Sequence, residues 1–519
     1  MRYYDCIVIG SGVAGLSTAL TAAENGLEVC IISKETFVQE CNSFYAQGGI
    51  VFRGEGDSAE LLEKDINTAG DNINNHTAVK LLAKEGPDIV KSILIDKIKI
   101  PFCKNDQGDF DRTREAAHSV RRILHVKDET GKAIETYFLD YIRNIKNIHL
   151  VSNHTAIDVI TNCHHSKDSQ EKYKEIRALG VYALDETSGE VKAYFANSIV
   201  LASGGVGNLY LHTSNPTGAM GDGIAMAYRA GAKINNAEFI QFHPTVLYHR
   251  DVKRFLISES LRGEGARLMN RRGEYFMQRY NSDLKDLAPR DEVARAIYRE
   301  IEKEGNGYVF LDATKITHLD VKDRFPGIYK KCSEVDIDIT RDPIPVVPAA
   351  HYFCGGIKTD LNGRTSIPGL YAAGEAACTG VHGANRLASV SLLEALYFGQ
   401  KIGTYISKKA RAPRKSLLNT IPDWIYPVEE EEFDPLLISN DLLSIQMTMW
   451  NYAGIIRSRK RLLRARADLN YLSHRIERFY NTAQLSRDII ELRNAVLAGG
   501  IIVKAAYANK KSIGCHFIR

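Results

Sequence analysis

Residues 6–33 combine two short apolar runs with a glycine-rich turn and an Ala/Leu-rich segment between them. The first run, Cys6 to Gly10, has the unbroken apolar pattern of a buried parallel strand. Gly10-Ser11-Gly12-Val13-Ala14-Gly15 follows at once and opens a predicted helix that ends near Gly26. The second run, Leu27 to Ser33, then completes a β-α-β unit.

The glycine turn has the spacing of a dinucleotide-binding motif. One glycine permits the tight turn, one lets the backbone approach a pyrophosphate, and one lets the helix lie close to the strand. The helix N-terminus then directs its partial positive charge at the phosphates. The acid that usually ends the second strand is displaced, because Ser33-Lys34-Glu35 stands there, so all three residues are candidates for the adenosine contacts.

Two later apolar runs also end on glycine. Residues 198–203 precede Gly204-Gly205, and Gly369-Leu370-Tyr371-Ala372-Ala373-Gly374-Glu375 is a predicted strand that ends on glycine and an acid. Glycine at a strand end permits close approach of the backbone to a ligand, although it is also common in plain turns. The recurrence predicts that distant parts of the chain enclose the same nucleotide.

The composition narrows the class of protein. The 519 residues, 44% of them hydrophobic and 25% charged, predict two or three globular domains. The net charge is only +4 and basic residues alternate with acidic ones, so we expect no nucleic-acid binding. The nine scattered cysteines have no metal-ligand spacing, so we expect no metal. We find no signal segment and no apolar run of membrane-spanning length, and therefore expect a cytoplasmic protein.

Several motifs together resemble the flavoprotein family of succinate dehydrogenase, fumarate reductase and L-aspartate oxidase, over nearly the whole chain. They are Ser43-Phe44-Tyr45-Ala46-Gln47-Gly48-Gly49, Gly221-Asp222-Gly223-Ile224-Ala225-Met226-Ala227, Gln241-Phe242-His243-Pro244-Thr245, Glu259-Ser260-Leu261-Arg262-Gly263-Glu264-Gly265 and His382-Gly383-Ala384-Asn385-Arg386-Leu387. The expected fold class is α/β, with a split Rossmann-like FAD-binding domain (residues 1–238 and 346–410), an inserted α+β capping domain (239–345) and a C-terminal helical domain (420–519).

The resemblance implies FAD as the cofactor and a set of residues that line its site. These are Ser11, Gly12, Val13, Ala14, Lys34, Asn42, Ser43, Phe44, Tyr45, Ala46, Gln47, Gly48, Gly49, Asp222, Glu375, Ser391 and Leu392. In the membrane-complex members a histidine at the position of Asn42 carries the flavin covalently, so we expect non-covalent FAD here. This difference also argues against a respiratory-complex subunit that works only when docked to an iron–sulfur partner.

Oxidising a dicarboxylate beside a flavin requires cations for two carboxylates and a route for a proton. The resemblance implies that His243, Ser258, His351 and Arg386 bind the substrate. It places Arg290 as the proton-transferring residue, with Glu259 and Arg262 as a relay on one helical turn. The alternative for Arg290 is a helix-start arginine paired with Asp291, and each histidine taken singly is more often structural.

Glu115 is the residue that bears on the choice of substrate. A carboxylate there repels another acid but attracts an ammonium group, which aspartate has and succinate lacks. Its alternative is a solvated acid paired with Arg114 or Arg121. We therefore expect oxidation of L-aspartate to iminoaspartate by hydride transfer to FAD. The family further implies reoxidation by oxygen or fumarate and delivery of the product to quinolinate synthase, toward NAD.

Two other activities remain open at this point. A soluble fumarate reductase or succinate-oxidising flavoprotein shares almost every residue named above, and a flavin-binding protein without catalysis is the second. Ala116-Ala117 replaces a Gly-Gly pair of the family, Val390 an Asn and Ile513 an Arg. After Pro413, Pro422 and the acidic run from Glu429 to Glu432, we expect helices, with Arg457, Arg461 and Arg464 on a solvated face.

Overall fold

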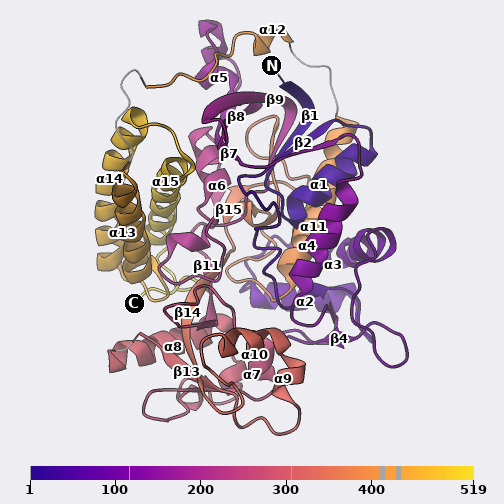
Figure 1. Ribbon diagram of the computed structural model, residues 1–519, viewed down its shortest axis with the longest axis vertical. Coiled ribbons are helices and arrows are strands. Elements are labelled where there is room, and N and C mark those ends of the chain that lie inside the picture. Colours follow the sequence, from indigo (N-terminus) through magenta and orange to yellow (C-terminus); the bar gives the residue numbers. More distant parts are fainter. Residues whose placement is uncertain (1, 116, 306, 410–414, 428–433) are drawn as a thin grey trace.

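The computed structural model describes residues 2–115, 117–305, 307–409, 415–427 and 434–519. Ala116, Pro413, the acidic run from Glu429 to Glu432 and the predicted domain end at 410 lie outside the described residues. The chain forms three regions around a central sheet, with the capping region below it and three long C-terminal helices beside it (Figure 1). Within the described ranges, no helix combines the length and the apolar character needed to cross a bilayer.

The central sheet has seven strands, in the order β6-β2-β1-β9-β8-β7, with β16 also paired to β9. Strands β6, β2, β1, β9 and β16 pair in parallel, whereas β7 and β8 are antiparallel additions. The strands are β1 (Arg2–Ile9), β2 (Val29–Ile32), β6 (Ile148–Val151), β7 (His154–Thr161), β8 (Ala178–Asp185), β9 (Glu190–Leu201) and β16 (Leu370–Ala372). The β-α-β unit predicted from the first residues is confirmed, with helix α1 (Val13–Glu24) between β1 and β2.

The glycines that follow β1, β9 and β16 meet at one edge of this sheet. Leu201 at the end of β9 pairs with Ile9 on one side and Ala372 on the other, so the three strands end together. Gly10 has φ +111°, and a Cβ there would collide with the carbonyl of Ala202. The carboxyl edge of the parallel sheet therefore gathers three glycine turns from distant parts of the chain.

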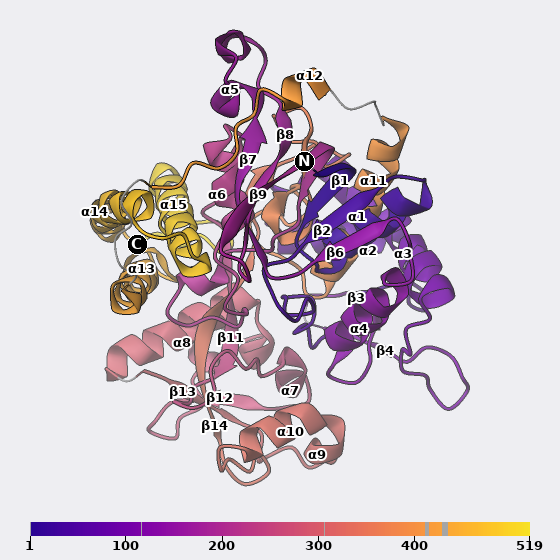
Figure 2. The ribbon, with the colours of Figure 1, turned by 45° about the horizontal axis from the view of Figure 1, so that its top comes forward.

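Helices cover the face of the sheet on which α1 lies (Figures 1 and 2). Helix α11 packs closely on α1, because Cβ atoms at Gly399 and Gly403 would overlap Ala14 and Thr21. The other helices of this side and its small antiparallel sheet are α2 (Ala59–Ala69), α3 (His76–Ile89), α4 (Thr130–Ile142), α11 (Val390–Lys408), β3 (Ile50–Val51), β4 (Arg112–Thr113) and β5 (Ile123–Leu124).

The capping region is built on the antiparallel sheet β11-β14-β13-β12. Its elements are β11 (Ile240–Leu247), α7 (Glu259–Gly263), β12 (Arg267–Met269), α8 (Arg290–Glu304), β13 (Val309–Asp312), α9 (Val321–Arg324), α10 (Pro326–Ser333) and β14 (Ile344–Phe353). The predicted boundary between 345 and 346 falls inside β14, which runs from the cap sheet back toward the cofactor region. At the start of α10, the backbone N–H of Gly327 donates to Asp128 across the two regions (2.9 Å).

The remaining short elements join these regions. They are α5 (Asn162–His165), α6 (Asp222–Arg229), α12 (Lys415–Leu418) and the three-stranded sheet of β10 (Ile234–Asn235), β15 (Gly356–Lys358) and β17 (Ala377–Cys378). Helix α6 begins at Asp222 and lies beside the C-terminal helix α15.

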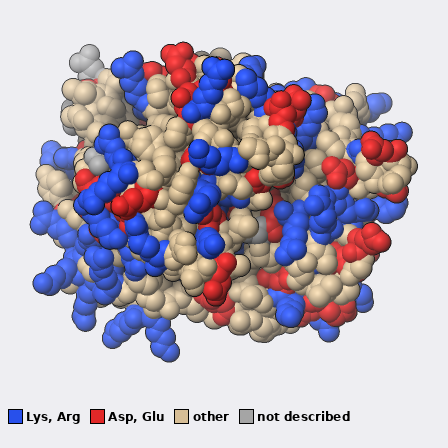
Figure 3. Space-filling view, turned by 90° about the horizontal axis from the view of Figure 1, so that it is seen from below, with Lys and Arg blue, Asp and Glu red and all other residues tan. Residues whose placement is uncertain are grey.

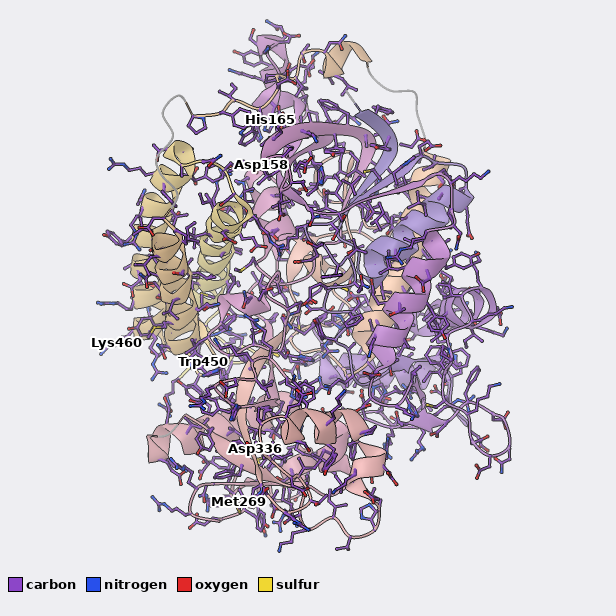
Figure 4. All side chains as sticks on the ribbon, viewed as in Figure 1. Asp158, His165, Met269, Asp336, Trp450 and Lys460 are labelled. Carbon is purple, nitrogen blue, oxygen red and sulfur yellow. The ribbon has the colours of Figure 1, made fainter. Side chains whose placement is uncertain are left out.

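The C-terminal helices are α13 (Pro435–Ala453), α14 (Arg459–Thr482) and α15 (Arg487–Ala508). Trp450 of α13 packs on His212 and Phe242, and Figure 4 shows it between these helices and the cap. Exposed basic residues of α14, such as Arg464 and Lys460, belong to the side on which Figure 3 shows Lys and Arg crowded at the left edge.

The expected solvated arginine face is wrong for Arg457. Its side chain is fully buried, and it precedes the N-cap of α14, Ser458, so it does not share the face of Arg464. The Arg457 guanidinium donates to the carbonyl of Glu238 (2.7 Å) and to those of Ala453 and Gly454. Several carbonyls acting together replace the carboxylate that a buried arginine usually finds.

Candidate active site

The N-terminus of α1 opens onto a cavity of about 610 Å³. Its N-cap is Gly12, which offers no side chain to the free N–H groups of the first turn. A Cβ at Gly15 would collide with the carbonyl of Gly10, so this spacing is required for helix and strand to touch. Glycine-lined backbone with a helix N-terminus is suited to a pyrophosphate.

The cavity brings together the predicted cofactor residues from six separate segments. It is lined by Ser11, Gly12, Ala14, Lys34, Asn42, Ser43, Phe44, Tyr45, Ala46, Gln47, Gly48, Gly49, Asp222, Glu375, Ser391 and Leu392. Val13 is the exception, because its side chain is buried and only its backbone N–H is turned to Ser43 Oγ (3.2 Å). The helix terminus and the acids for hydroxyl groups fit a dinucleotide such as FAD.

Glu375 lies on the cavity wall beside Asn42. Its Oε2 accepts from the Asn42 amide (2.7 Å) and its Oε1 from the backbone N–H of Phe353 (2.9 Å). Burial raises the pKa of Glu375 to about 7, although both hydrogen bonds oppose the shift. Because the Asn42 amide is not a nucleophile, the residues fit a flavin held without a covalent bond.

Two paired strands carry the histidines at the far end of the cavity. The register of β11 and β14 sets His243 opposite Ala349, which brings the His351 ring to 5.2 Å from the His243 ring. The backbone N–H of Thr245 donates to Nδ1 of His243 (3.2 Å), so the ring proton belongs on Nε2. That Nε2 is buried without a protein partner and is free to donate to a bound anion.

The electrostatics keep both histidines neutral. Burial, together with Arg290, holds the pKa of His243 well below its ordinary value, and burial with Arg386 does the same for His351. The positive charge of the site therefore resides on the arginines. Arg386 lies over the Tyr352 ring (4.6 Å) and donates to Ser391 Oγ (3.0 Å) and Gln241 Oε1 (3.2 Å).

Arg290, the first residue of α8, is paired with Glu259 rather than with Asp291. Its Nε donates to Glu259 Oε2 at 2.6 Å, while Asp291 is bound to Arg295 (2.7 Å). Arg262 lies one turn along α7, with its Nη2 3.9 Å from the same Glu259 oxygen. Burial raises the pKa of Glu259, but the two arginines outweigh it and hold the pKa below its ordinary value. These contacts make the continuous chain of groups that a relay needs.

Glu115 faces the cavity instead of the arginines beside it. Its Oε2 accepts from Ser389 Oγ (2.7 Å), whereas Arg114 and Arg121 donate to the carbonyls of His118 and Arg112 (both 2.8 Å). A Cβ at Gly48 would collide with Glu115 Oε1. The carboxylate is thus fixed between the flavin-binding motif and the start of α11.

Ser258 is the N-cap of α7, and its Oγ accepts from the N–H of Ser260 (3.3 Å). The hydroxyl proton remains available to the cavity, which Ser258 lines together with Glu115, His243, Glu259, Arg290, His351 and Arg386. Arg262 is the one predicted substrate-side residue that does not reach the wall. The individual roles of these residues stay predictions.

Comparison with known proteins agrees with this geometry. A family model described as FAD binding domain matches residues 5–392. L-aspartate oxidases of Pseudomonas aeruginosa and Ralstonia nicotianae are 41% and 42% identical, each over 99% of this chain and 95% of theirs. The chain belongs to the L-aspartate oxidase family of FAD-dependent oxidoreductases. A chloroplastic member from Oryza sativa is 38% identical over 99% of this chain and 81% of its own.

Solved structures place the family within the larger flavoprotein group. The quinol fumarate reductase of E. coli matches with a TM-score of 0.86 and 26% identity, covering all of this chain and 92% of that one. Mycobacterium smegmatis Sdh1 matches with a TM-score of 0.81 and 28% identity, covering 100% and 89%. The resemblance inferred from the motifs is therefore confirmed at the level of the family and of the fold.

The sequence motifs missed several residues that shape the site. Ser389 stands between two quoted motifs, with φ +57°, and its position directly before Val390-Ser391 was a usable signal. Tyr352, beneath Arg386, follows His351 and was detectable in the same way. Glu491 and Asn494 of α15 carry no local signal, since they lie far along the chain from the residues that they contact.

Proposed function

We propose that this enzyme oxidises L-aspartate to iminoaspartate. FAD, when bound, accepts the hydride from C2 of the substrate. Arg386, His351 and His243 bind the two carboxylates, and Glu115 binds the ammonium group. The single observation that carries the choice of aspartate is the Glu115 carboxylate, held at 2.7 Å by Ser389 inside a cavity otherwise lined with cations.

Proton movement is assigned to Arg290 and its partners. An arginine is a poor base alone, because its reference pKa exceeds about 12. The Arg290–Glu259 contact of 2.6 Å and the adjacent Arg262 give a proton taken from the substrate a path away from the cavity. The cap that carries these residues also excludes water, since it closes over the cavity through the contact of Asp128 with Gly327.

The acceptor and the fate of the product form the second part of the proposal. Fumarate matches the same cations with its two carboxylates, so it competes for the substrate site and reoxidises the enzyme; oxygen is the other acceptor. We propose that the unstable imine passes to quinolinate synthase, toward NAD, in the cytoplasm. The alternative activity, a soluble fumarate reductase or succinate oxidase, uses the same cations but leaves Glu115 without a ligand.

The test is anaerobic mixing of the flavin-loaded protein with L-aspartate, D-aspartate, succinate and L-glutamate in turn, followed by flavin absorbance. We expect L-aspartate alone to bleach the flavin. Bleaching by succinate but not L-aspartate would refute the role of Glu115 and move the enzyme to the dehydrogenase branch.

A further inference from the structure

Helix α15 reaches the cavity where β2 ends, although it belongs to the C-terminal helical region. It lies beside α6, whose first residue is Asp222 (Figures 1 and 2). Three of its side chains contact the segment after β2 or the start of α6: Arg487, Glu491 and Asn494. In a dinucleotide fold this edge faces the adenosine ribose.

Lys34 has no proton to spare for a phosphate. Its ammonium donates to Asp222 Oδ2 (2.6 Å), to Glu491 Oε1 (2.6 Å) and to the carbonyl of Gly218 (2.7 Å). An ammonium group has three donors, and all three are used. Burial lowers the pKa of Lys34, but the two carboxylates outweigh it and raise the pKa above its ordinary value. Lys34 is therefore placed to position Asp222.

Asp222 is fixed from both sides. Its Oδ2 accepts from Lys34, and its Oδ1 accepts from the Asn494 amide (2.8 Å). Asn494 is itself oriented, because its Oδ1 accepts from Arg229 (2.8 Å). Each Asp222 oxygen keeps a lone pair, so the carboxylate remains able to accept from hydroxyl groups in the cavity.

Glu35, the other acid near the end of β2, faces the helix. Both of its oxygens accept from Arg487 (2.5 and 3.2 Å), which also donates to Glu491 (3.1 Å) and to the carbonyl of Lys34 (3.2 Å). Of the two acids at this end of the cavity, Asp222 is thus the one whose oxygens are each left with a single protein donor.

We propose that α15 is a structural part of the cofactor site: Glu491 and Asn494 hold Lys34 and Asp222 so that Asp222 accepts the ribose hydroxyls of FAD. The inference rests on FAD as the cofactor in the proposed function, and it does not depend on the substrate. By linkage, binding of FAD and docking of the C-terminal helices stabilise each other.

The test is titration of flavin-free protein with FAD, followed by quenching of flavin fluorescence. Glu491→Gln keeps the shape but removes the charge, so we expect the Kd for FAD to rise about tenfold. Asn494→Asp sets a second carboxylate against Asp222, and the repulsion raises the Kd further. Circular dichroism of the flavin-free variants checks that they are folded.

Glu477→Gln is the matched control. Glu477 of α14 pairs with Arg493 of α15 (3.2 Å), which also contacts Asp158 of β7, labelled in Figure 4, so this variant loosens α15 away from the cavity. We expect its Kd for FAD to stay within about twofold of wild type, because no listed charge of the ribose end changes. Wild-type affinity in Glu491→Gln and Asn494→Asp would overturn the proposal, as would equal weakening by Glu477→Gln.

Hydrogen exchange gives a second measurement that does not involve catalysis. In wild type, FAD should slow exchange of the backbone amides of residues 487–495, and Asn494→Asp should lose most of this effect. Protection confined to the first turn of α1 would overturn the coupling. A loaded wild type that leaves L-aspartate unoxidised but shows these FAD effects would refute the proposed function alone.

Discussion

The two ends of the cavity differ in how their charges are paired. At the ribose end Lys34 lies between two carboxylates at 2.6 Å, and Arg487 is bound to Glu35. At the substrate end, His243 Nε2 and Arg290 Nη1 are buried without a protein partner. An unsatisfied buried donor costs about 1–3 kcal/mol. One end is thus complete before a ligand arrives, whereas the other is completed by an anion.

The largest expected effect comes from breaking the substrate end at Arg290. Arg290→Gln removes the charge and the link to Glu259, so kcat for L-aspartate should fall about 10³-fold, the scale of lost acid–base catalysis. Arg295→Gln, on the same helix but paired with Asp291, is the control and should keep kcat within a few-fold. Steady-state kinetics of the FAD-saturated variants measures both. Equal losses would show that α8 packing, and not Arg290 itself, matters.

The next effect concerns stability between the two ends, at Glu375. Its ordinary pKa of 4.5 becomes about 7 in the folded protein. Between these values the folded state keeps a proton that the unfolded chain has released, so stability falls as pH rises from 4.5 to about 7. Glu375→Gln lacks this loss, and by pH 8 it should gain up to about 3 kcal/mol on wild type relative to pH 4.5. Unfolding of flavin-free protein measures this; parallel pH curves would contradict it.

Glu115→Gln sharpens the comparison by changing an anion among cations. The ammonium loses its counter-charge, so kcat/KM for L-aspartate should fall about 100-fold. Fumarate has no ammonium, and its reduction should be unchanged or faster. The ratio of the two activities in one preparation is the measurement. A parallel loss of both would indicate damage to the flavin site.

The smallest effect is expected at Ser389, which orients Glu115. Ser389→Ala removes the hydroxyl, and KM for L-aspartate should rise about tenfold with kcat nearly unchanged. Because φ is +57° there, Ser389→Gly is the matched variant that removes the hydroxyl without backbone strain. Similar KM values in both variants would assign the effect to the hydrogen bond, whereas a defect in the Ala variant alone would assign it to strain.

How much was predictable follows from how local each interaction is. The β-α-β unit is encoded in adjacent residues, since the Gly10 turn, the helix and β2 follow one another. The substrate residues needed the family motifs, because β11 and β14 pair across a long insertion. The contact of Asn494 with Asp222 and the burial of Arg457 arise from docking of whole helices, which no pattern within a segment encodes.

Asn42, bound to Glu375 where a covalent attachment site stands in the membrane-complex relatives, has a consequence for the cell. A flavin that is held only by non-covalent contacts exchanges with the surrounding pool. The fraction of molecules able to work then follows mass action, reaching one half when free FAD equals its Kd. Flavin supply therefore sets the capacity of this enzyme, in a way that a covalently loaded relative escapes after its first turnover.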